Sequence, residues 1–434
     1  MNKRKLYAFS KKYLNPKTIQ PIVLLIVLAF LILHKHNNNM LDFHNLIDFT
    51  VFGAIVLVLI CTAIANLLSK VIMKFCEDSA KLHTNYDQLM ARYPLPSSKF
   101  FKFDSPAVPL ENNIINDSIK HTVTFPVIPL WLKQYGDNKY VIAIEDDKYK
   151  NYKLPTQVAE HSTDLMSAHI FSDTYNNVVI RLDDIQSNQY KSIKLVTSRT
   201  NYFDSLITNR AMDYSFKVGK TIRDIYEPGP YLNELSRSKL SNHLGFNGFV
   251  EFSDGMIVFA RRAGNVSIGK NMLSVSVEAA LKAKYALNSD LEFTAGGLSH
   301  AICKTIKDEL NISMGEKSDF CNHIIAFYRD VVEGGKPQFL FYVKNNDMTS
   351  DEMKEHFNSR NKLNKKNTDR AGNALHFLSR SELARCALSA NKLILPSDVA
   401  QREGRKEFTM MPSSSASIAM MLKYFAGEAN VEGH

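Results

Sequence analysis

Residues Gly248 to Arg262 read GFVEFSDGMIVFARR, and this stretch decides the fold. Two runs of apolar residues flank Ser253-Asp254-Gly255. An Asp-Gly pair between such runs favours a tight turn between antiparallel strands, because glycine adopts the positive φ that the turn requires. The stretch therefore predicts a β-hairpin whose second strand ends at Arg261 and Arg262.

Further elements follow this hairpin. Gly297 to Leu310 reads GLSHAICKTIKDEL and places Ala301, Ile302, Ile306 and Leu310 on one face at helical spacing, with Asn311 as a stop. Residues 333–337 read EGGKP and predict a second hairpin between strands at 323–332 and 339–343. The sequence also predicts a charged helix at 350–363, a strand at 393–395 and a closing amphipathic helix at 414–425.

The region ahead of the hairpin has a different pattern. Short runs rich in β-branched residues predict strands at 140–144, 177–182 and 192–196. Residues 199–210 predict a short helical segment, and 231–243 a helix after the turn Pro228-Gly229-Pro230. Before these, 74–92 reads as a helical stalk that Pro94 and Pro96 terminate, and 100–118 reads as an irregular linker.

The N-terminal part contains two apolar runs. Phe49 to Leu68, FTVFGAIVLVLICTAIANLL, carries no charge, and about 20 such residues suffice for a helix to cross a bilayer. Ile19 to Leu33 is shorter, and together the runs predict a two-helix transmembrane hairpin over 19–73. The alternatives are a buried helical hairpin and, for the first run, a cleaved signal peptide, although 34–37 offers no small-residue cleavage site.

Charge indicates the orientation of such a hairpin. Six basic residues and no acid precede the first run, and Lys70, Lys74 and Lys81 follow the second. The basic excess on both outer flanks predicts a multi-pass membrane protein with both termini cytoplasmic. The chain of 434 residues has a net charge of +9, without the dense basic stripe of a duplex nucleic-acid reader. Its five cysteines show no metal-like spacing and predict reduced thiols.

The order of the elements resembles a Nudix domain over roughly 244–430. Strand, turn, strand ending in Arg-Arg, glycine-containing segment, helix and strand follow one another as in that family. Aligned on the end of the Nudix box, Asp308 and Glu309 take the paired glutamates and Asn311 the glycine. Lys304 stands at the arginine, Thr305 at the first glutamate and Ile312 at the final hydrophobe.

The departures from the box bear on catalysis. Nudix hydrolysis needs clustered carboxylates that hold divalent cations against a diphosphate. Thr305 replaces one of these acids, and Asp308 is one methylene shorter than glutamate. The resemblance therefore implies a domain that binds nucleotide-like ligands without cleaving them: not an enzyme, with no catalytic residues, no metal site and no cofactor.

A membrane hairpin joined to a degenerate Nudix-like domain is similar to the two-transmembrane effectors with SMODS-associated Nudix-like sensors in cyclic-oligonucleotide-based antiphage signalling (CBASS). That resemblance implies an effector of the bacterial inner membrane. A partner nucleotidyltransferase would supply a cyclic di- or trinucleotide, which activates the effector. Binding would drive homo-oligomerisation, pore formation or another disruption of the lipid bilayer, and cell death.

Ligand phosphates call for Arg and Lys, and bases call for aromatic or guanidinium stacking. The residues selected on this ground lie ahead of the hairpin, at its end, in the loop after it, on the helix and on the following strand. They are Tyr202, Arg210, Arg261, Arg262, Lys270, Asn271, Ser274, Glu309, Tyr328 and Arg329.

The expected fold is thus α+β: an N-terminal two-helix transmembrane hairpin, then a cytoplasmic α/β/α Nudix-like domain with an additional β-rich extension. The expected divisions are a basic N-terminus at 1–18, the hairpin at 19–73, stalk and linker at 74–118, an α/β extension at 119–243 and the Nudix-like domain at 244–434. Two other functions stay open. One is a membrane-tethered Nudix hydrolase of a nucleoside diphosphate derivative, and the other is a scaffold that docks a protein.

Overall fold

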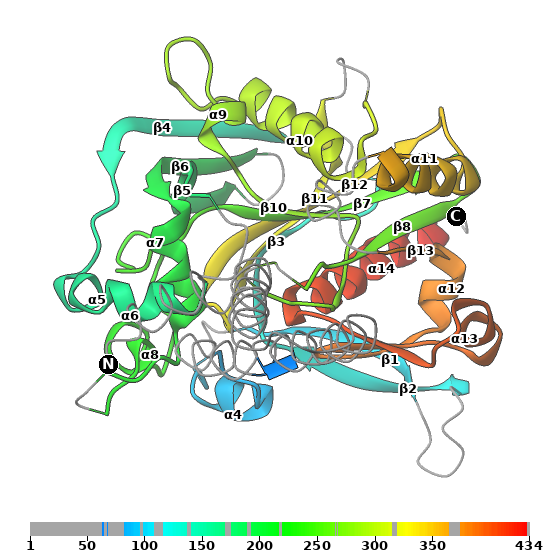
Figure 1. Cartoon of the computed structure of the whole chain (residues 1–434), viewed down its shortest axis with the longest axis horizontal. Coiled ribbons are helices and arrows are strands. Elements are labelled where there is room, and N and C mark those ends of the chain that lie inside the picture. Colours follow the sequence, from blue (N-terminus) through cyan, green and yellow to red (C-terminus); the bar gives the residue numbers. More distant parts are fainter. Residues whose placement is uncertain are drawn as a thin grey trace, which may run out of the picture. The chain divides into compact units, whose positions relative to one another are not determined.

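The centre of the molecule is an eight-stranded mixed sheet (Figure 1). The computed structural model describes residues 63–64, 67, 82–95, 99–107, 116–136, 140–169, 175–188, 192–216, 219–264, 266, 268–314, 319–363 and 374–431. The sheet runs β13-β8-β7-β12-β11-β3, with β10 paired to β7 and β9 to β8. Its strands are β3 (Val127–Leu132), β7 (Gly245–Phe252), β8 (Met256–Arg261), β9 (Leu273–Ser274), β10 (Val277–Ala280), β11 (Ile324–Asp330), β12 (Lys336–Asn345) and β13 (Ala374–Ser379).

Both predicted hairpins are confirmed. Strands β7 and β8 flank Ser253 to Gly255, and Gly255 has a φ of +78°, as the Asp-Gly turn requires. Strands β11 and β12 pair antiparallel around Gly334 and Gly335, which both have positive φ. Strand β12 then runs parallel to β7, and this pairing joins the two hairpins into one sheet.

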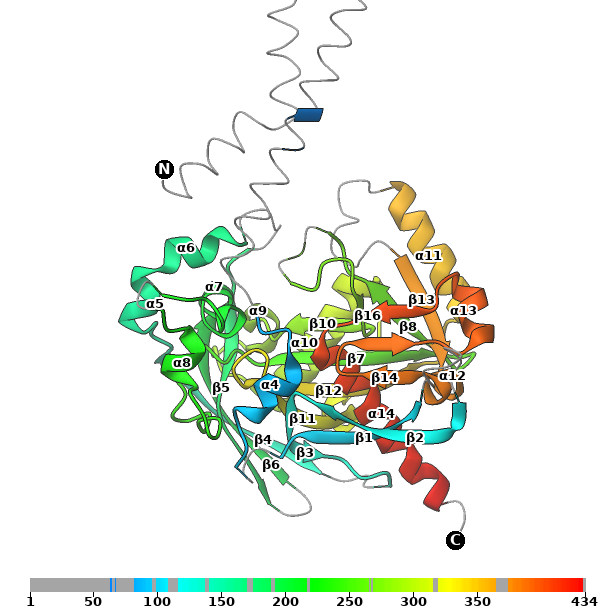
Figure 2. The same ribbon diagram turned by 90° about the horizontal axis from the view of Figure 1, so that it is seen from below.

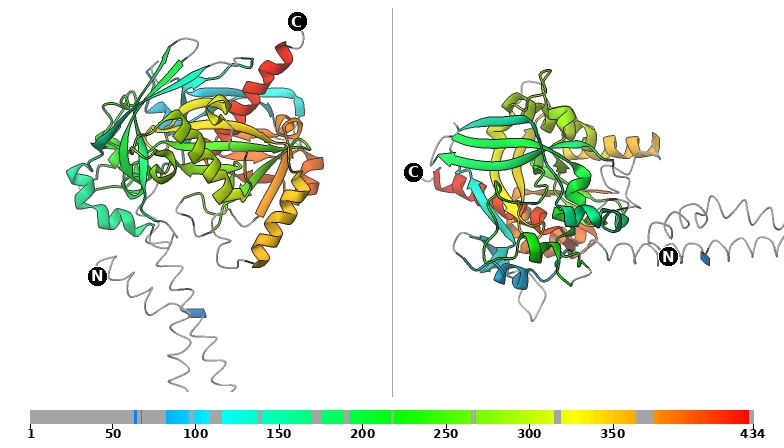
Figure 3. Two further views of the ribbon diagram at one scale, coloured as in Figure 1. Left: turned by 90° about the horizontal axis from the view of Figure 1, so that it is seen from above. Right: turned by 90° about the vertical axis from the view of Figure 1, so that its left-hand side faces the viewer.

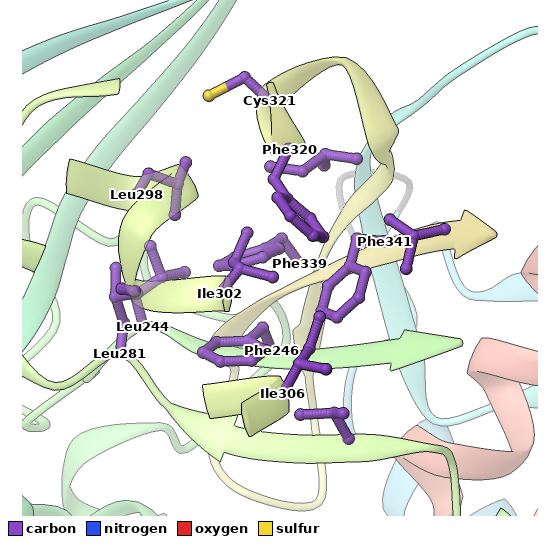
Figure 4. Packing of buried hydrophobic residues seen from close by; sticks show 14 of the residues in the cluster. Leu244, Phe246, Leu281, Leu298, Ile302, Ile306, Phe320, Cys321, Phe339 and Phe341 are labelled. Carbon is purple, nitrogen blue, oxygen red and sulfur yellow. The ribbon is translucent and has the colours of Figure 1, made fainter. Parts of the chain in front are cut away.

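Helices cover the two faces of this sheet. Strand β7 alternates: Phe246 and Val250 belong to the core beneath helix α10 (Ala295–Leu310), and Phe249 to the core beneath helix α14 (Pro412–Val431). Leu298, Ile302 and Ile306 of α10 turn toward phenylalanine rings of the sheet (Figure 4). The result is a central sheet with a helix packed on each face.

Helix α10 begins and ends as its sequence indicates. The Thr294 side chain accepts a hydrogen bond from the backbone N–H of Gly297, which caps the first turn. Asn311 ends the helix in the left-handed conformation, with a φ of 60°. These two residues fix where Asp308 and Glu309, in the last turn, lie relative to the sheet.

A second sheet lies ahead of the first in the sequence. It contains β4 (Val141–Asn151), β6 (Ser192–Asn201) and β5 (Val178–Asn188), in that order, with β4 parallel to β6 (Figure 3). The inner residues Ile180, Leu182 and Leu195 belong to the same hydrophobic core as α10. The short helices of this part of the sequence are α4 (Tyr86–Ala91), α5 (Thr156–Glu160), α7 (Tyr202–Leu206), η2 (Asn209–Ala211) and α8 (Ile222–Tyr226).

Small elements complete the α14 side. Strands β1 (Phe101–Ala107) and β2 (Asn116–Phe125) form an antiparallel ribbon, and β14 (Ala387–Ser389), β15 (Lys392–Ile394) and β16 (Glu407–Thr409) form a three-stranded sheet (Figure 2). The remaining helices are α9 (Ala283–Ala286), η3 (Phe320–His323), α11 (Ser350–Leu363), α12 (Arg380–Arg385) and α13 (Ser397–Glu403).

Contacts within the chain divide it into two units. One unit comprises residues 81–160 and 172–434 and contains everything above. The other comprises 1–80 and 161–171. Its described helix is α6 (Ser162–Ser167), which follows His161 at its N-terminal end.

The expected transmembrane hairpin is not supported. Among the described residues, no helix is both long and apolar enough to cross a membrane. The longest of them, α14 with 20 residues, contains four serines in its first six positions and Lys423 further on. This finding corrects the predicted fold class in its N-terminal part and the predicted inner-membrane location. The segment 19–73 itself lies outside the described residues, apart from 63–64 and 67.

Two local predictions were also wrong. The segment 100–118, expected to be irregular, contributes β1 and the start of β2. Residues 231–243 form no helix, and Asn242 adopts a left-handed φ of 47° there. Asn242 is held in place by Asn209: the Asn242 backbone N–H donates to Asn209 Oδ1 at 2.9 Å, and Asn209 Nδ2 donates to Asn242 Oδ1 at 3.0 Å. These tertiary contacts override the local helical pattern.

Candidate functional site

The central sheet opens between β7 and β8. These strands pair directly only at Glu251 and Ile257, beside their turn. Beyond that point β10 pairs with β7 and β9 pairs with β8. Ser276 bridges the opening, because its hydroxyl accepts the backbone N–H of Val250 at 2.9 Å and donates to the carbonyl of Val258. The segment from Ser274 to Glu278 is thereby inserted into the sheet and brings polar side chains with it.

Glu278 is the centre of these polar side chains. Its Oε2 accepts from Arg262 Nη1 at 3.0 Å, from Ser274 Oγ at 2.8 Å and from Ser414 Oγ, in the first turn of α14, at 3.4 Å. Burial opposes ionisation, but Arg262 and the Ser274 hydrogen bond outweigh it and lower the pKa of Glu278. Glu278 is therefore a carboxylate that is already held by three protein donors.

A second group of charges lies deeper, around the β11–β12 turn. Lys336 Nζ donates to Glu333, and both side chains are buried. Arg210 Nε lies 3.5 Å from Glu333 Oε1, and Arg210 Nη1 donates to the Tyr202 hydroxyl at 3.0 Å. Burial alone would lower the pKa of Arg210, but Tyr202, Glu333 and Glu278 raise it. Arg210 thus connects this group electrostatically to Glu278.

One buried nitrogen in this deeper group, His243 Nδ1, lacks a hydrogen-bond partner among the described residues. Burial, together with Lys336 and Arg210, lowers the pKa of His243 well below its ordinary value, so His243 is neutral. Buried polar atoms are almost always hydrogen-bonded, so such orphaned atoms indicate a place for water or a ligand group.

The last turn of α10 forms the outer part of the cluster. Asp308 Oδ2 accepts the Tyr285 hydroxyl at 2.7 Å. The ammonium groups of Lys282 and Lys284 lie over the Tyr285 ring, at 5.6 and 4.5 Å from its centroid. Glu309 is half-buried and makes no direct ion pair or hydrogen bond with its side chain among the described residues. Burial raises the pKa of Glu309 to about 7, against the opposing effect of Lys282 and Arg262.

We call this set the polar cluster. Its members come from η2, the end of β8, β9, β10, the segment before α9, the end of α10 and the β11–β12 turn. They are Arg210, Arg262, Ser274, Glu278, Lys282, Asp308, Glu309, Glu333 and Lys336.

The chemistry that the polar cluster can perform depends on which of its carboxylates are already bound to protein donors. Glu278, Asp308 and Glu333 each accept a hydrogen bond or ion pair, which leaves Glu309 as the carboxylate without a direct partner. Thr305 is buried and donates to the Ala301 carbonyl at 2.8 Å. No group of three or more His, Cys, Asp or Glu side chains in the described ranges is arranged to hold a metal ion.

The structure brings together half of the residues that the sequence selected. Arg262, Ser274 and Glu309 belong to the polar cluster, and Tyr202 reaches it through Arg210. Arg261 lies apart and donates to the Asn271 carbonyl at 3.3 Å. Lys270 and Asn271 belong to the turn before β9.

Tyr328 and Arg329 are buried and form hydrogen bonds inside the fold. The Tyr328 hydroxyl accepts from Asn247 Nδ2 at 3.0 Å beneath α14. Arg329 donates to the carbonyls of Gly335 and Asn233 at 2.9 and 2.7 Å.

The residues selected from the sequence did not include five members of the polar cluster: Glu278, Lys282, Asp308, Glu333 and Lys336. Asp308 was aligned with a glutamate of the Nudix box but was not selected as a ligand-binding residue. Glu278 lies in SVSVEAA, which alternates as a strand, and a charged residue in an otherwise apolar strand was the available signal. Lys282 and Glu333 have no local signal, because only the tertiary fold brings them near Glu309 and Arg210.

Comparison with known proteins assigns no family. No protein-family model matches the chain, and no curated protein matches it. Among solved structures, the crystal structure of DR0079 from Deinococcus radiodurans matches at 17% sequence identity and a TM-score of 0.21, over 33% of this chain and 71% of that one. A TM-score this low carries no argument about fold or function.

Proposed function

We propose that residues 81–160 and 172–434 form a binding module for a phosphate-bearing nucleotide, with the polar cluster as its site. The observation that supports the proposal is that three of the four acidic side chains in the polar cluster are already bound to a protein donor. Glu278, Asp308 and Glu333 are each held by a protein donor. Hard divalent cations need several oxygen ligands, and Glu309 alone supplies too few to assist hydrolysis of a diphosphate.

The cluster offers groups that suit such a ligand. Lys282 is half-buried and forms no ion pair with a described residue, so its ammonium group is available to a phosphate. Tyr285, beside it, offers an aromatic ring at which a base can stack. Deeper in the cluster, His243 Nδ1 lacks a hydrogen-bond partner among the described residues. A ligand that reaches inward from Lys282 would satisfy this atom.

The finer proposal is that the ligand is a cyclic oligonucleotide made by a partner nucleotidyltransferase, and that binding promotes self-association in an antiphage response. The resemblance to CBASS sensors supports it, and the arrangement of Lys282 and Tyr285 is compatible with it. The proposal does not include an action on a membrane.

A hydrolase is the second candidate, and Glu309 is the observation that favours it. A carboxyl with a pKa of about 7 can act as a general base near neutral pH. The proposed binding function requires that the bound nucleotide remain intact, so the two candidates differ in a measurable product.

The test is calorimetric titration of the full chain with cyclic di- and trinucleotides, with and without Mg²⁺, followed by chromatography of the nucleotide. We expect one ligand to bind and to be recovered intact. Lys282→Met removes one charge-assisted contact and weakens binding by about tenfold or more. Lys354→Met, on the exposed face of α11, is the matched control and leaves the affinity unchanged. Mg²⁺-dependent breakdown would establish the hydrolase, and no binding by any ligand would refute the binding function.

A further inference from the structure

The sheet β4-β6-β5 has two edges, and the described residues cover only the β5 edge (Figure 1). There the Ile180 N–H donates to the Leu281 carbonyl at 3.0 Å, and the Leu182 N–H donates to the Asn242 carbonyl at 3.2 Å. At the β4 edge, none of residues 141–146 forms a backbone hydrogen bond with a described residue outside the β4–β6 ladder. The backbone groups that point to this edge therefore have no partner in the described part of the chain.

The edge of β4 also lacks the features that usually protect such a strand from pairing with another chain. Residues 141–146 read VIAIED and contain no proline, glycine or lysine. Their pairing with β6 is regular, and the first register shift comes after Asp146. Six residues at about 3.3 Å each give an edge of about 20 Å. A regular, unprotected edge of this length is a template on which another strand can pair.

We propose that β4 pairs with β4 of a second copy of this chain, antiparallel, about a twofold axis at Ala143. This pairing joins two three-stranded sheets into one sheet of six strands. Two identical edges in antiparallel orientation are self-complementary, because each supplies the donors and acceptors that the other needs. The association requires no nucleotide, so it goes beyond the binding function proposed above and does not depend on it.

The side chains of β4 favour this register. Ile142 belongs to the core beneath α10, and Ile144 packs against that core while half-buried. In the proposed register Ile142 lies opposite the partner's Ile144, so the pairing covers the exposed part of Ile144. Val141 lies opposite the partner's Glu145, so no two acids face each other. A register centred on Glu145 would instead place two glutamates opposite each other, which is unfavourable.

The test is sedimentation of the full chain without nucleotide, at a series of protein concentrations. We expect a reversible equilibrium between monomer and dimer. Ala143 is exposed, and Ala143→Lys places two like charges opposite each other across the twofold axis. We expect this variant, and Ala143→Glu for the same reason, to weaken the association at least about tenfold. A wild-type chain that stayed monomeric up to its solubility limit would overturn the proposal.

A mixture of the two variants tests the twofold axis itself. Chains with Ala143→Lys and chains with Ala143→Glu, mixed in equal amounts, place opposite charges across the axis. We expect the mixture to associate about tenfold more tightly than either variant alone. Recovery requires that residue 143 of one copy faces residue 143 of the other. A mixture that associated as weakly as the separate variants would refute the proposed pairing.

Gln186→Lys is the matched control. Gln186 is exposed on β5, and in the ladders Lys194 of β6 pairs with Gln186 on one side and with Ala143 on the other. Both substitutions therefore add one positive charge beside the same lysine, but β6 separates Gln186 from the β4 edge. We expect Gln186→Lys to leave the association unchanged, and unchanged melting temperatures of the variants to confirm that the fold is retained. Equal weakening by Gln186→Lys and Ala143→Lys would overturn the proposal.

Discussion

Arg262 and Glu278 form an ion pair across the opening of the central sheet, with Arg262 Nη1 at 3.0 Å from Glu278 Oε2 and 17% of each side chain exposed. Arg262 follows β8, and Glu278 belongs to β10. The pair therefore connects two strands that do not pair with each other. The ion pair also keeps the Glu278 carboxylate, at the centre of the polar cluster, bound to a protein donor.

The first prediction concerns this pair. Arg262→Met leaves Glu278 with two serine donors and without a direct ion-pair partner. We expect this variant to lower the free energy of unfolding at pH 7 by about 1–3 kcal/mol, which is less than the loss expected for a fully buried pair. Arg262→Met combined with Glu278→Gln recovers part of this loss. Urea unfolding measures both effects, and Lys354→Met, which breaks an exposed pair with Asp351, is the control, with a change below about 0.5 kcal/mol.

The pH dependence of the same pair has a definite sign. The folded state lowers the pKa of Glu278 below its ordinary value of 4.5, so its contribution to stability is present above that value and is lost as the pH falls through the lowered pKa. Glu278→Gln removes this contribution. A variant whose stability declined as steeply as the wild type on acidification below pH 4.5 would contradict the assignment.

Glu309 gives the second prediction, with the opposite sign. Its pKa in the folded state is about 7, above the ordinary value of 4.5, so the folded state holds the proton more tightly than the unfolded state. The free energy of unfolding therefore declines as the pH rises from about 4.5 to about 7. We expect Glu309→Gln to flatten this decline and to stabilise the protein at pH 8 by about 1–2 kcal/mol, a figure reduced for the partial exposure of the side chain.

Urea unfolding at pH 5, 6, 7 and 8 measures this effect. Glu355→Gln, an exposed glutamate on α11, is the matched control and leaves the pH profile unchanged. If Glu309→Gln retained the decline of the wild type, another group would be responsible for it. The raised pKa also predicts that an anionic ligand binds the polar cluster more tightly at pH 6 than at pH 8, because Glu309 is neutral at the lower pH.

The parts of the fold that the sequence predicted are those with local causes. Gly255 and Asn311 both adopt positive φ where a turn or a helix end requires it, and helical spacing identified Ala301, Ile302 and Ile306 as the buried face of α10. The site was less predictable. Glu278 and Glu333 act through residues that are distant in sequence, Arg262 and Arg210, and only the assembled sheet brings them together.

Arg223 gives the third prediction. Its guanidinium is fully buried, pairs with Asp213 through two hydrogen bonds of 2.9 and 3.0 Å, and donates to the carbonyls of Val331 and Val332 at 2.9 and 2.7 Å. Arg223→Met removes the counterion of the largely buried Asp213, which keeps only the backbone N–H of His83 as a donor, and it removes the side-chain donors to the Val331 and Val332 carbonyls. We expect a loss of about 3–5 kcal/mol. Arg237→Met removes an exposed pair with Glu234 and is the control, with a change below about 0.5 kcal/mol in the same urea titration. Similar losses in both variants would contradict the structural role of Arg223.

The last prediction concerns two adjacent glycines in the first turn of α10. A Cβ at Gly296 would approach no atom closer than 3.9 Å. A Cβ at Gly297 would lie 1.9 Å from the carbonyl oxygen of Ala286. This oxygen is a backbone atom, so it cannot move aside unless α9 shifts. Gly296→Ala removes the entropic disadvantage of glycine in a helix, and we expect it to stabilise the protein by about 0.5–1 kcal/mol. Gly297→Ala gains the same entropy but forces α10 away from α9, and we expect a net loss of about 1–3 kcal/mol. Thermal and urea unfolding of the two variants measure the difference, and each serves as the control of the other, since they differ by one position in the same turn. Equal effects of the two substitutions would show that α10 does not pack against Ala286 as closely as the structure has it.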